Sequence, residues 1–195
     1  MHSEHSMRRF FVLGGIVASA VLIVFGAASI YMGIDGRSEV RDSIAREKIV
    51  GTPDSSIAGD KVDTGTEAKT FAATIRKHTL EITGDRTYAE MGRYVTADGT
   101  ETNDEKEAAT DPKTGQPVAN ATRDLWVTST ALSTALNTSY FAEQVSTFAI
   151  VMGVALLLTG IGFAVLTLGV LRLPVTQVQV LPVRDTDRTA TPNPA

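Results

Sequence analysis

The chain has 195 residues, no cysteine and a net charge of −4. Without cysteine it can form neither disulfides nor thiolate metal sites. The acidic excess lies in residues 35–143, between two apolar blocks, and an acidic middle argues against nucleic-acid binding, which needs a basic surface.

The first apolar block covers residues 10–34 and contains no charged side chain. About 20 apolar residues suffice for a helix to cross the bilayer core, whereas the apolar part of a signal peptide spans only about 7–15. We therefore predict a retained transmembrane helix, and a cleaved signal peptide stays the alternative. The polar segment 1–9 before it is predicted to be a disordered cytoplasmic N-terminus.

The second apolar block, residues 144–171, is also free of charge and predicts a second transmembrane helix. Arg8, Arg9 and Arg172 lie directly against the two blocks, and basic flanks are normally cytoplasmic. This predicts a multi-pass protein of the cell membrane with both termini in the cytoplasm and residues 35–143 outside it. The proline-rich segment 172–195 is expected to be a disordered cytoplasmic tail.

Small residues recur at heptad spacing in both blocks and let helix backbones approach closely in lipid. This pattern predicts a packed intrachain hairpin, and a homo-oligomeric seam stays open as the alternative. The candidate packing residues are Ser19, Gly26 and Gly33 in the first block, and Ala155, Gly162 and Gly169 with Gly153 and Gly160 alongside in the second.

Residues 64–83 read as a helix. Thr64 followed by Glu67 has the spacing of a capping box, and Gly84 is a plausible stop. Apolar residues at helical spacing, among them Phe71, Ile75 and Ile82, predict one buried face.

His78 projects onto that same face and could be a pH-sensitive group, a ligand or a packed core histidine. Glu81 follows three residues later, but no third ligand is in sight, so neither a metal nor a cofactor is expected. Tyr88 stands in a second capping-box pattern, from Thr87 to Glu90, that predicts a short helix. His78, Glu81 and Tyr88 are the candidate residues of any enzymatic site.

Residues 96–117 are acidic and rich in turn formers, which predicts a flexible loop. The segment 119–142 then carries no charge between Asp124 and Glu143, and its leucines form a stripe. We expect a helix that packs against 64–83, with Leu132 and Leu136 joining Phe71 and Ile75 in one core, and that continues into the second membrane helix. Trp126 is expected to be a core or partner-contact residue.

The segments REKIVGTPDSSIAGDKVD and IRKHTLEITGDRTYAEM, followed by a glycine-rich second span, resemble a group of two-span membrane proteins of actinobacteria. Members of that group often carry an automatic label of aromatic ring-opening dioxygenase. The resemblance implies the two-span topology and no catalytic residue. The label itself requires two histidines and a carboxylate on iron, whereas the external segment contains His78 alone.

The sequence thus predicts a mainly α membrane protein: a two-helix transmembrane hairpin with a small, mostly helical extracytoplasmic domain between the spans. The expected function is that of a non-enzymatic scaffold or accessory subunit of a cell-envelope complex. Its partners would be the lipid bilayer and another protein, or a second copy bound through the spans. A homo-oligomeric transport or pore component is the alternative, and an enzyme with a site near His78 is a further one.

Overall fold

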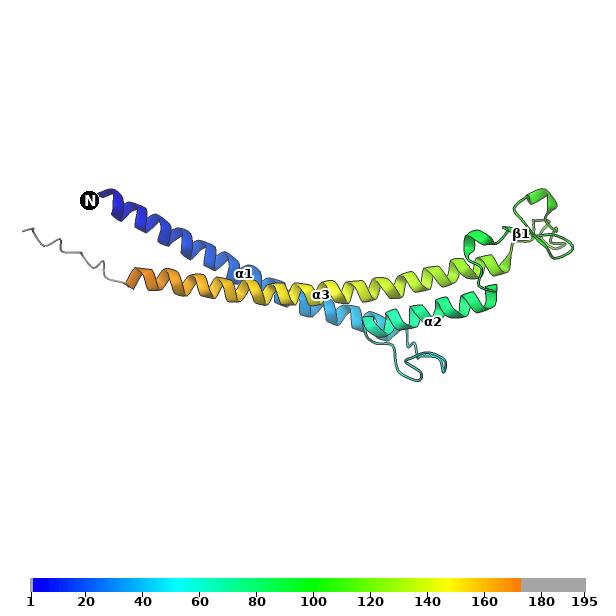
Figure 1. Ribbon diagram of the computed structural model, residues 1–195, viewed down its shortest axis with the longest axis horizontal. Coiled ribbons are helices and arrows are strands. Elements are labelled where there is room, and N and C mark those ends of the chain that lie inside the picture. Colours follow the sequence, from blue (N-terminus) through cyan, green and yellow to red (C-terminus); the bar gives the residue numbers. More distant parts are fainter. Residues whose placement is uncertain (1, 173–195) are drawn as a thin grey trace, which may run out of the picture.

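The computed structural model describes residues 2–172, over which the chain forms a long helical hairpin with a third helix alongside (Figure 1). Helix α1 covers His2–Arg46, and helix α3 covers Ala121–Arg172. The shorter helix α2, Gly65–Thr83, lies beside the N-terminal half of α3. The His2 end of α1 and the Arg172 end of α3 lie at the same end of the molecule. The predicted mainly α fold is therefore confirmed.

Two helices of the described part, α1 and α3, are long and apolar enough to cross a membrane by length and composition. Neither is confined to its apolar block. Helix α1 continues through residues 35–46, and α3 runs without a break from the uncharged segment 121–143 into the apolar segment 144–171, as predicted. The segment 1–9, predicted to be disordered, is helical from His2, because no proline or glycine interrupts the chain there. The predicted tail lies, except for Arg172, outside the described residues.

Glycines bring the backbones of α1 and α3 together where the two helices cross. A Cβ added at Gly26 would lie 2.6 Å from the backbone nitrogen of Leu157 and 2.7 Å from the carbonyl oxygen of Gly153. Gly33 and Gly160 are similarly tight against the opposite helix, and Ser19 is buried. Because the side chain is missing at these positions, the two backbones can touch as they do in lipid-embedded helix pairs.

The predicted packing face of the second apolar block is wrong in one respect. A Cβ added at Gly162 or Gly169 would meet no atom within 4 Å, and Ala155 is exposed. The seam toward α1 instead follows Gly153 and Gly160, which lie to one side of that stripe. Both sets recur every seven residues, so the heptad spacing identified two possible faces and only the position of α1 selects one of them.

Helix α2 begins and ends at the residues that its capping signals indicate. Thr64 Oγ1 accepts a hydrogen bond from the backbone nitrogen of Glu67 at 3.3 Å, and Glu67 Oε2 accepts one from the backbone nitrogen of Thr64 at 3.0 Å. Gly84 then turns the chain with φ of 61°, a left-handed conformation that favours glycine. The predicted capping box and stop are both confirmed.

A small apolar core lies where the end of α1, the loop after it, α2 and α3 meet. Phe71 and Ile75 pack at its edge, as predicted, but Leu132 and Ile82 are exposed, contrary to the prediction. Leu136 is buried in the core, as predicted, but serines of α3 face α2 beyond it, which places Leu132 outside the contact. The core residues are Ile44, Val62, Ala68, Ala72 and Leu136.

The acidic segment 96–117, predicted to be a flexible loop, contains short paired segments. Strands β1, Tyr94–Val95, and β2, Glu101–Thr102, pair antiparallel, and further isolated bridges join Thr96 to Ala108 and Thr110 to Pro117. A turn of 3-10 helix, η2, covers Glu105–Glu107. The turn formers close tight turns between these pairs and so fold the segment into a compact tip beyond α2 and α3 (Figure 1).

Candidate functional site

Helices α1, α2 and α3 all contact one carboxylate, Glu143, whose side chain is only 6% exposed. Its Oε1 accepts hydrogen bonds from Arg37 Nε at 3.0 Å and Arg41 Nε at 2.8 Å, both on α1. Its Oε2 accepts one from the backbone nitrogen of Gly65 at 2.6 Å. That nitrogen is one of the donors left free at the start of α2, so a residue of α3 caps α2 and holds α1 at the same time.

The local chemistry keeps Glu143 ionised. Burial by itself raises the pKa of this carboxyl, but the hydrogen bonds from Gly65 and from the two arginines outweigh burial and set its pKa below the ordinary value. Gly65 is required at this point, since a Cβ there would lie 2.8 Å from Glu143 Oε2 and 2.9 Å from the Cα of Tyr140. The junction is not among the features predicted from the sequence. The signal that could have found it is a lone carboxylate between two uncharged stretches of one predicted helix, with two arginines one helical turn apart just after the first apolar block.

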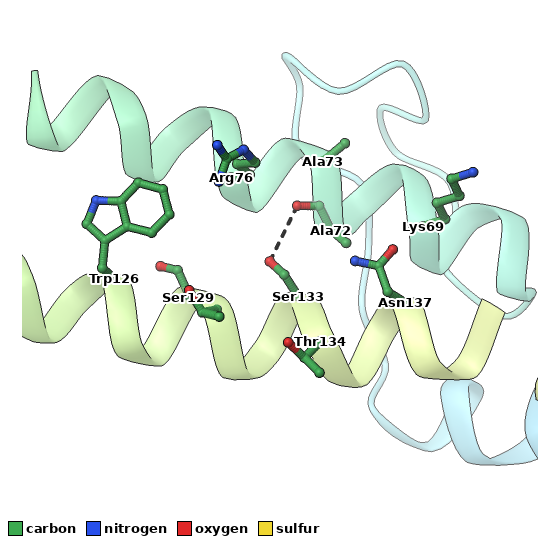
Figure 2. A pocket seen from close by; sticks show the side chains of 10 residues that line it. Lys69, Ala72, Ala73, Arg76, Trp126, Ser129, Ser133, Thr134 and Asn137 are labelled. Carbon is green, nitrogen blue, oxygen red and sulfur yellow. Dashed lines mark hydrogen bonds between the residues drawn. The ribbon is translucent and has the colours of Figure 1, made fainter. Parts of the chain in front are cut away.

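A groove of about 400 Å³ runs between α2 and α3 beyond this junction (Figure 2). Its α3 wall carries hydroxyl and amide groups at helical spacing, and its α2 wall carries two alanines between two cationic side chains. Two contacts close its floor: Thr79 Oγ1 donates to Ser129 Oγ at 2.8 Å, and Ser133 Oγ donates to the carbonyl oxygen of Ala72 at 3.5 Å. The residues along the groove that remain accessible include Lys69, Ala73, Arg76, Thr130, Thr134 and Asn137.

The two cations of the groove stack on aromatic rings. Lys69 Nζ lies 4.5 Å from the ring centre of Tyr140, and the guanidinium of Arg76 lies 5.3 Å from the ring of Trp126. Neither cation forms an ion pair with a carboxylate in the described part of the chain. Hydroxyls, an amide and two cations suit a polar or anionic ligand segment. No acidic or histidine side chain lies among the residues that line the groove.

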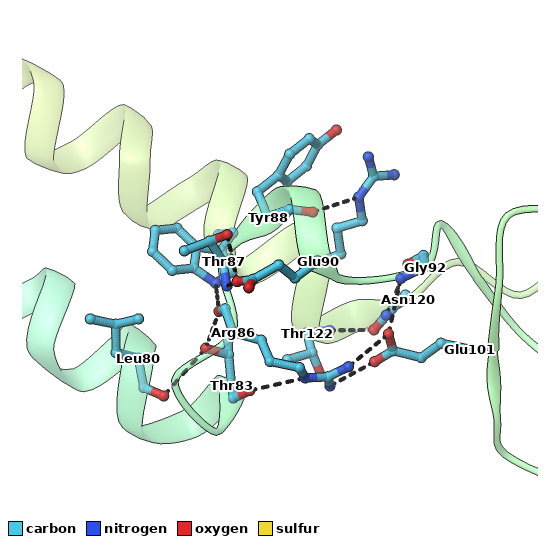
Figure 3. Close-up of polar contacts among 12 residues, drawn as sticks. Leu80, Thr83, Arg86, Thr87, Tyr88, Glu90, Gly92, Glu101, Asn120 and Thr122 are labelled. Atoms are coloured by element: carbon cyan, nitrogen blue, oxygen red, sulfur yellow. Dashed lines mark hydrogen bonds and ion pairs between the residues drawn. The ribbon is translucent and has the colours of Figure 1, made fainter.

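Trp126 links the groove to the tip. Its side chain is buried, as predicted for a core or contact residue, and its Nε1 donates to the carbonyl oxygen of Arg86 at 2.9 Å. Figure 3 shows that the side chain of Arg86 then pairs with both oxygens of Glu101, at 3.0 and 2.8 Å. Glu101 Oε2 also accepts a hydrogen bond from the backbone nitrogen of Gly92. These contacts connect the tip to the first turns of α3.

His78 contacts the loop that follows α1 rather than a ligand site. Its Nε2 lies 2.7 Å from Asp54 Oδ2, and Lys77 Nζ lies 3.0 Å from the same oxygen. The hydrogen bond with His78, followed by those from Lys77 and Thr52, holds the pKa of the Asp54 carboxyl well below its usual range. The arrangement fastens the loop to α2 and leaves His78 half-exposed.

The other two candidate residues contact different partners. Glu81 Oε1 lies 3.8 Å from Lys77 Nζ on α2. Tyr88 belongs to η1, the single 3-10 turn Tyr88–Glu90, and the guanidinium of Arg123 stacks 4.0 Å above its ring. The Thr87–Glu90 pattern thus starts a single turn, in which Glu90 Oε2 accepts from the backbone nitrogen of Thr87. Lys77 links Glu81 to Asp54, the partner of His78, whereas Tyr88 stacks with Arg123 outside this cluster.

Within residues 2–172, no group of three or more histidine, aspartate or glutamate side chains is placed to hold a metal ion. Comparisons with protein-family models, with curated proteins and with solved structures gave no match. The groove between α2 and α3 is the candidate binding site.

Proposed function

We propose that this chain is a non-enzymatic integral membrane protein that acts as a scaffold or accessory subunit of a cell-envelope complex. The segments 10–34 and 144–171 anchor it as a two-span hairpin, with both termini in the cytoplasm. The segment 35–143 projects from the outer surface and binds a protein partner through the groove between α2 and α3.

One observation carries the proposal: α3 is a single helix that joins an apolar, charge-free segment to the groove. At 1.5 Å per residue, the twenty residues from Trp126 to Ser146 place the groove as much as about 30 Å beyond the apolar segment. The junction at Glu143 fixes α1 and α2 to this helix, so a contact in the groove is held at a set height above the anchor. Such a geometry suits presentation of a surface to another protein.

The chemistry of the groove supports binding over catalysis. Its accessible groups are hydroxyls, the Asn137 amide and the cations Lys69 and Arg76, which can pair with carboxylates or carbonyls of a partner segment. The enzymatic alternative is supported less well, because Tyr88 stacks with Arg123 away from His78 and Glu81, and His78 is already engaged by Asp54. The resemblance to two-span actinobacterial proteins implies the same topology and is consistent with an anchored subunit.

The test is photo-cross-linking of the full-length protein in its own membrane. A photoreactive amino acid replaces Ala73, which lines the groove and is exposed. The control places it at Ile82, which is also an exposed residue of α2 but does not line the groove. We expect one reproducible protein adduct from position 73 and none from position 82, and the charge reversals Lys69→Glu and Arg76→Glu should abolish it.

Equal adducts from both positions, or no adduct from position 73, would contradict a partner site in the groove. The transport alternative has a separate readout. Reconstituted protein that makes liposomes leak to small ions, while mild purification recovers no stoichiometric partner, would favour a pore over an accessory subunit.

A further inference from the structure

The middle of the groove between α2 and α3 is lined by small side chains at helical spacing. On the α2 wall, Ala72 and Ala73 lie between Lys69 and Arg76 (Figure 2). Two helices that turn small residues toward a shared groove leave room for the backbone of a third helix, as in a helix bundle. The α3 wall carries hydroxyl side chains two to a turn, at Ser129, Thr130, Ser133 and Thr134.

The charged side chains that line the groove are both positive. Lys69 and Arg76 are exposed and lie seven residues apart, which places them on one face of α2 and about 10 Å apart along its axis. Within residues 2–172 neither forms an ion pair with a carboxylate. Each instead stacks on an aromatic ring of α3, Tyr140 or Trp126, and this contact holds the cation at the groove without using its N–H donors.

Lys77, the neighbour of Arg76 in sequence, provides the contrast. It does not line the groove, and its Nζ lies 3.0 Å from Asp54 Oδ2 and 3.8 Å from Glu81 Oε1. Helix α2 therefore pairs the cation that faces the loop after α1 with carboxylates of the described chain. The two cations of the groove have no such pairing, so both are open to carboxylates of another molecule.

We infer that the groove takes an acidic helix of the partner, with two carboxylates seven residues apart and small residues between them. The inference rests on the proposed function, in which a protein partner binds in the groove, and it names the chemistry of that partner. Carboxylates at this spacing share one face of a helix and match the separation of Lys69 and Arg76. Small residues between them let the helix lie close to the alanines of α2 and the hydroxyls of α3.

The chain provides its own reporter, because Trp126 is its single tryptophan and stacks with Arg76 at the groove. The probe is a synthetic alanine-based peptide, stapled as a helix, with two glutamates seven residues apart. The control peptide has the same composition, but its glutamates are five residues apart and lie on different faces. With the full-length protein in non-ionic detergent, we expect a saturable change in Trp126 fluorescence and an affinity about tenfold higher for the probe than for the control, since the control loses one charged contact.

Charge reversal provides the second measurement. The double variant Lys69→Glu with Arg76→Glu should lose the acidic peptide and bind the same peptide with lysines in place of its glutamates, a gain that also shows the variant to be folded. The control Lys106→Glu with Lys113→Glu changes the net charge by the same amount at exposed residues of the tip, outside the groove. This control should bind the acidic peptide as the wild type does.

Three results would overturn the inference: no saturable change with the acidic probe, equal affinity for the two acidic peptides, or equal loss of binding by the tip variant and the groove variant. The proposed function fails separately. A photo-adduct from position 73 that survives both charge reversals in the native membrane would leave the partner site in place and show that the partner is not acidic. No adduct from position 73 would contradict the proposed function whatever the peptides show.

Discussion

Helix α3 contacts two neighbours along its length, and the two contacts use different chemistry. Toward α1 it presents glycines, and the backbones approach until a single added Cβ would collide. Toward α2 it presents Leu136, which packs in the apolar core, and serines that form hydrogen bonds. Glu143 then caps α2 with a charge and also pairs with two arginines of α1. In lipid, close packing is the main source of attraction between helices, whereas a small pair of helices in water needs specific polar contacts as well as burial. The difference teaches that one continuous helix can be held by close backbone packing along its apolar segment and by polar contacts along the segment before it.

Substitution at the glycine contact between α1 and α3 should lower the free energy of unfolding most. Gly26→Leu places a large side chain where a Cβ alone would lie 2.6 Å from the backbone of α3, so the crossing must open. We expect a loss of about 3 kcal/mol in the free energy of unfolding, at the upper end of overpacking effects. Thermal unfolding of the detergent-solubilised full chain, followed by circular dichroism, measures it.

Gly14→Leu is the matched control on the same helix, since nothing lies within 4 Å of its Cβ position. Equal unfolding temperatures for the two variants would show that α1 and α3 do not cross at Gly26.

Substitution at Glu143 should have the second largest effect on the free energy of unfolding. Glu143→Gln removes the charge that holds Arg37, Arg41 and the backbone nitrogen of Gly65. We expect a loss of about 2 kcal/mol, the usual range for hydrogen bonds to a charged group, because the two arginines remain partly solvated. Gln144→Ala, a change at the exposed neighbour, should have little effect.

The same contact has a defined pH dependence. Because the pKa of Glu143 is lowered in the folded chain, its contribution is complete above the ordinary value of 4.5 and is lost as the pH falls below it. Protection of the amides in the first turn of α2, meaning their exchange rate relative to the intrinsic rate at the same pH, should fall in acid for the wild type and be low at all pH values for Glu143→Gln. Unchanged protection in both proteins would contradict the cap.

Substitution of Trp126 should have a smaller effect, and it tests the hydrogen bond of the indole separately from the packing of the ring. Trp126→Phe keeps most of the ring but loses the donor to the Arg86 carbonyl, and we expect a loss of about 1 kcal/mol in the free energy of unfolding. The loss should appear as faster amide exchange in the turn after α2, with the α1–α3 crossing unaffected. Faster exchange throughout the chain would instead indicate that Trp126 stabilises the whole fold.

The contact between Asp54 and His78 should have the smallest effect, because both side chains are well exposed. The pKa of Asp54 is lowered by His78 and Lys77, so its contribution is present above the usual carboxyl value of 3.8 and is lost as the pH falls below that value. Asp54→Asn should loosen the loop at residues 52–60 at neutral pH, measured as faster limited proteolysis there. Equal proteolysis of the variant and the wild type would show that this contact does not hold the loop.

Much of the architecture is determined by local sequence. The charge-free blocks 10–34 and 144–171 predict long apolar helices, and the Thr64–Glu67 pair with Gly84 sets the ends of α2. These features depend on neighbours in the chain. They could therefore be predicted without knowing what lies nearby in space.

Only the tertiary structure decided which faces meet. The heptad spacing of α3 contains two series of small residues, and the position of α1 selects Gly153 and Gly160 while it leaves Gly162 and Gly169 open. Of the two leucines predicted for the α2 contact, Leu136 is buried in the core, whereas Leu132 is exposed because serines face α2 there. Glu143 gains its role from groups that are distant in the sequence, on α1 and at the start of α2. A helical period states which residues share a face, but the partner that covers the face is a property of the folded chain.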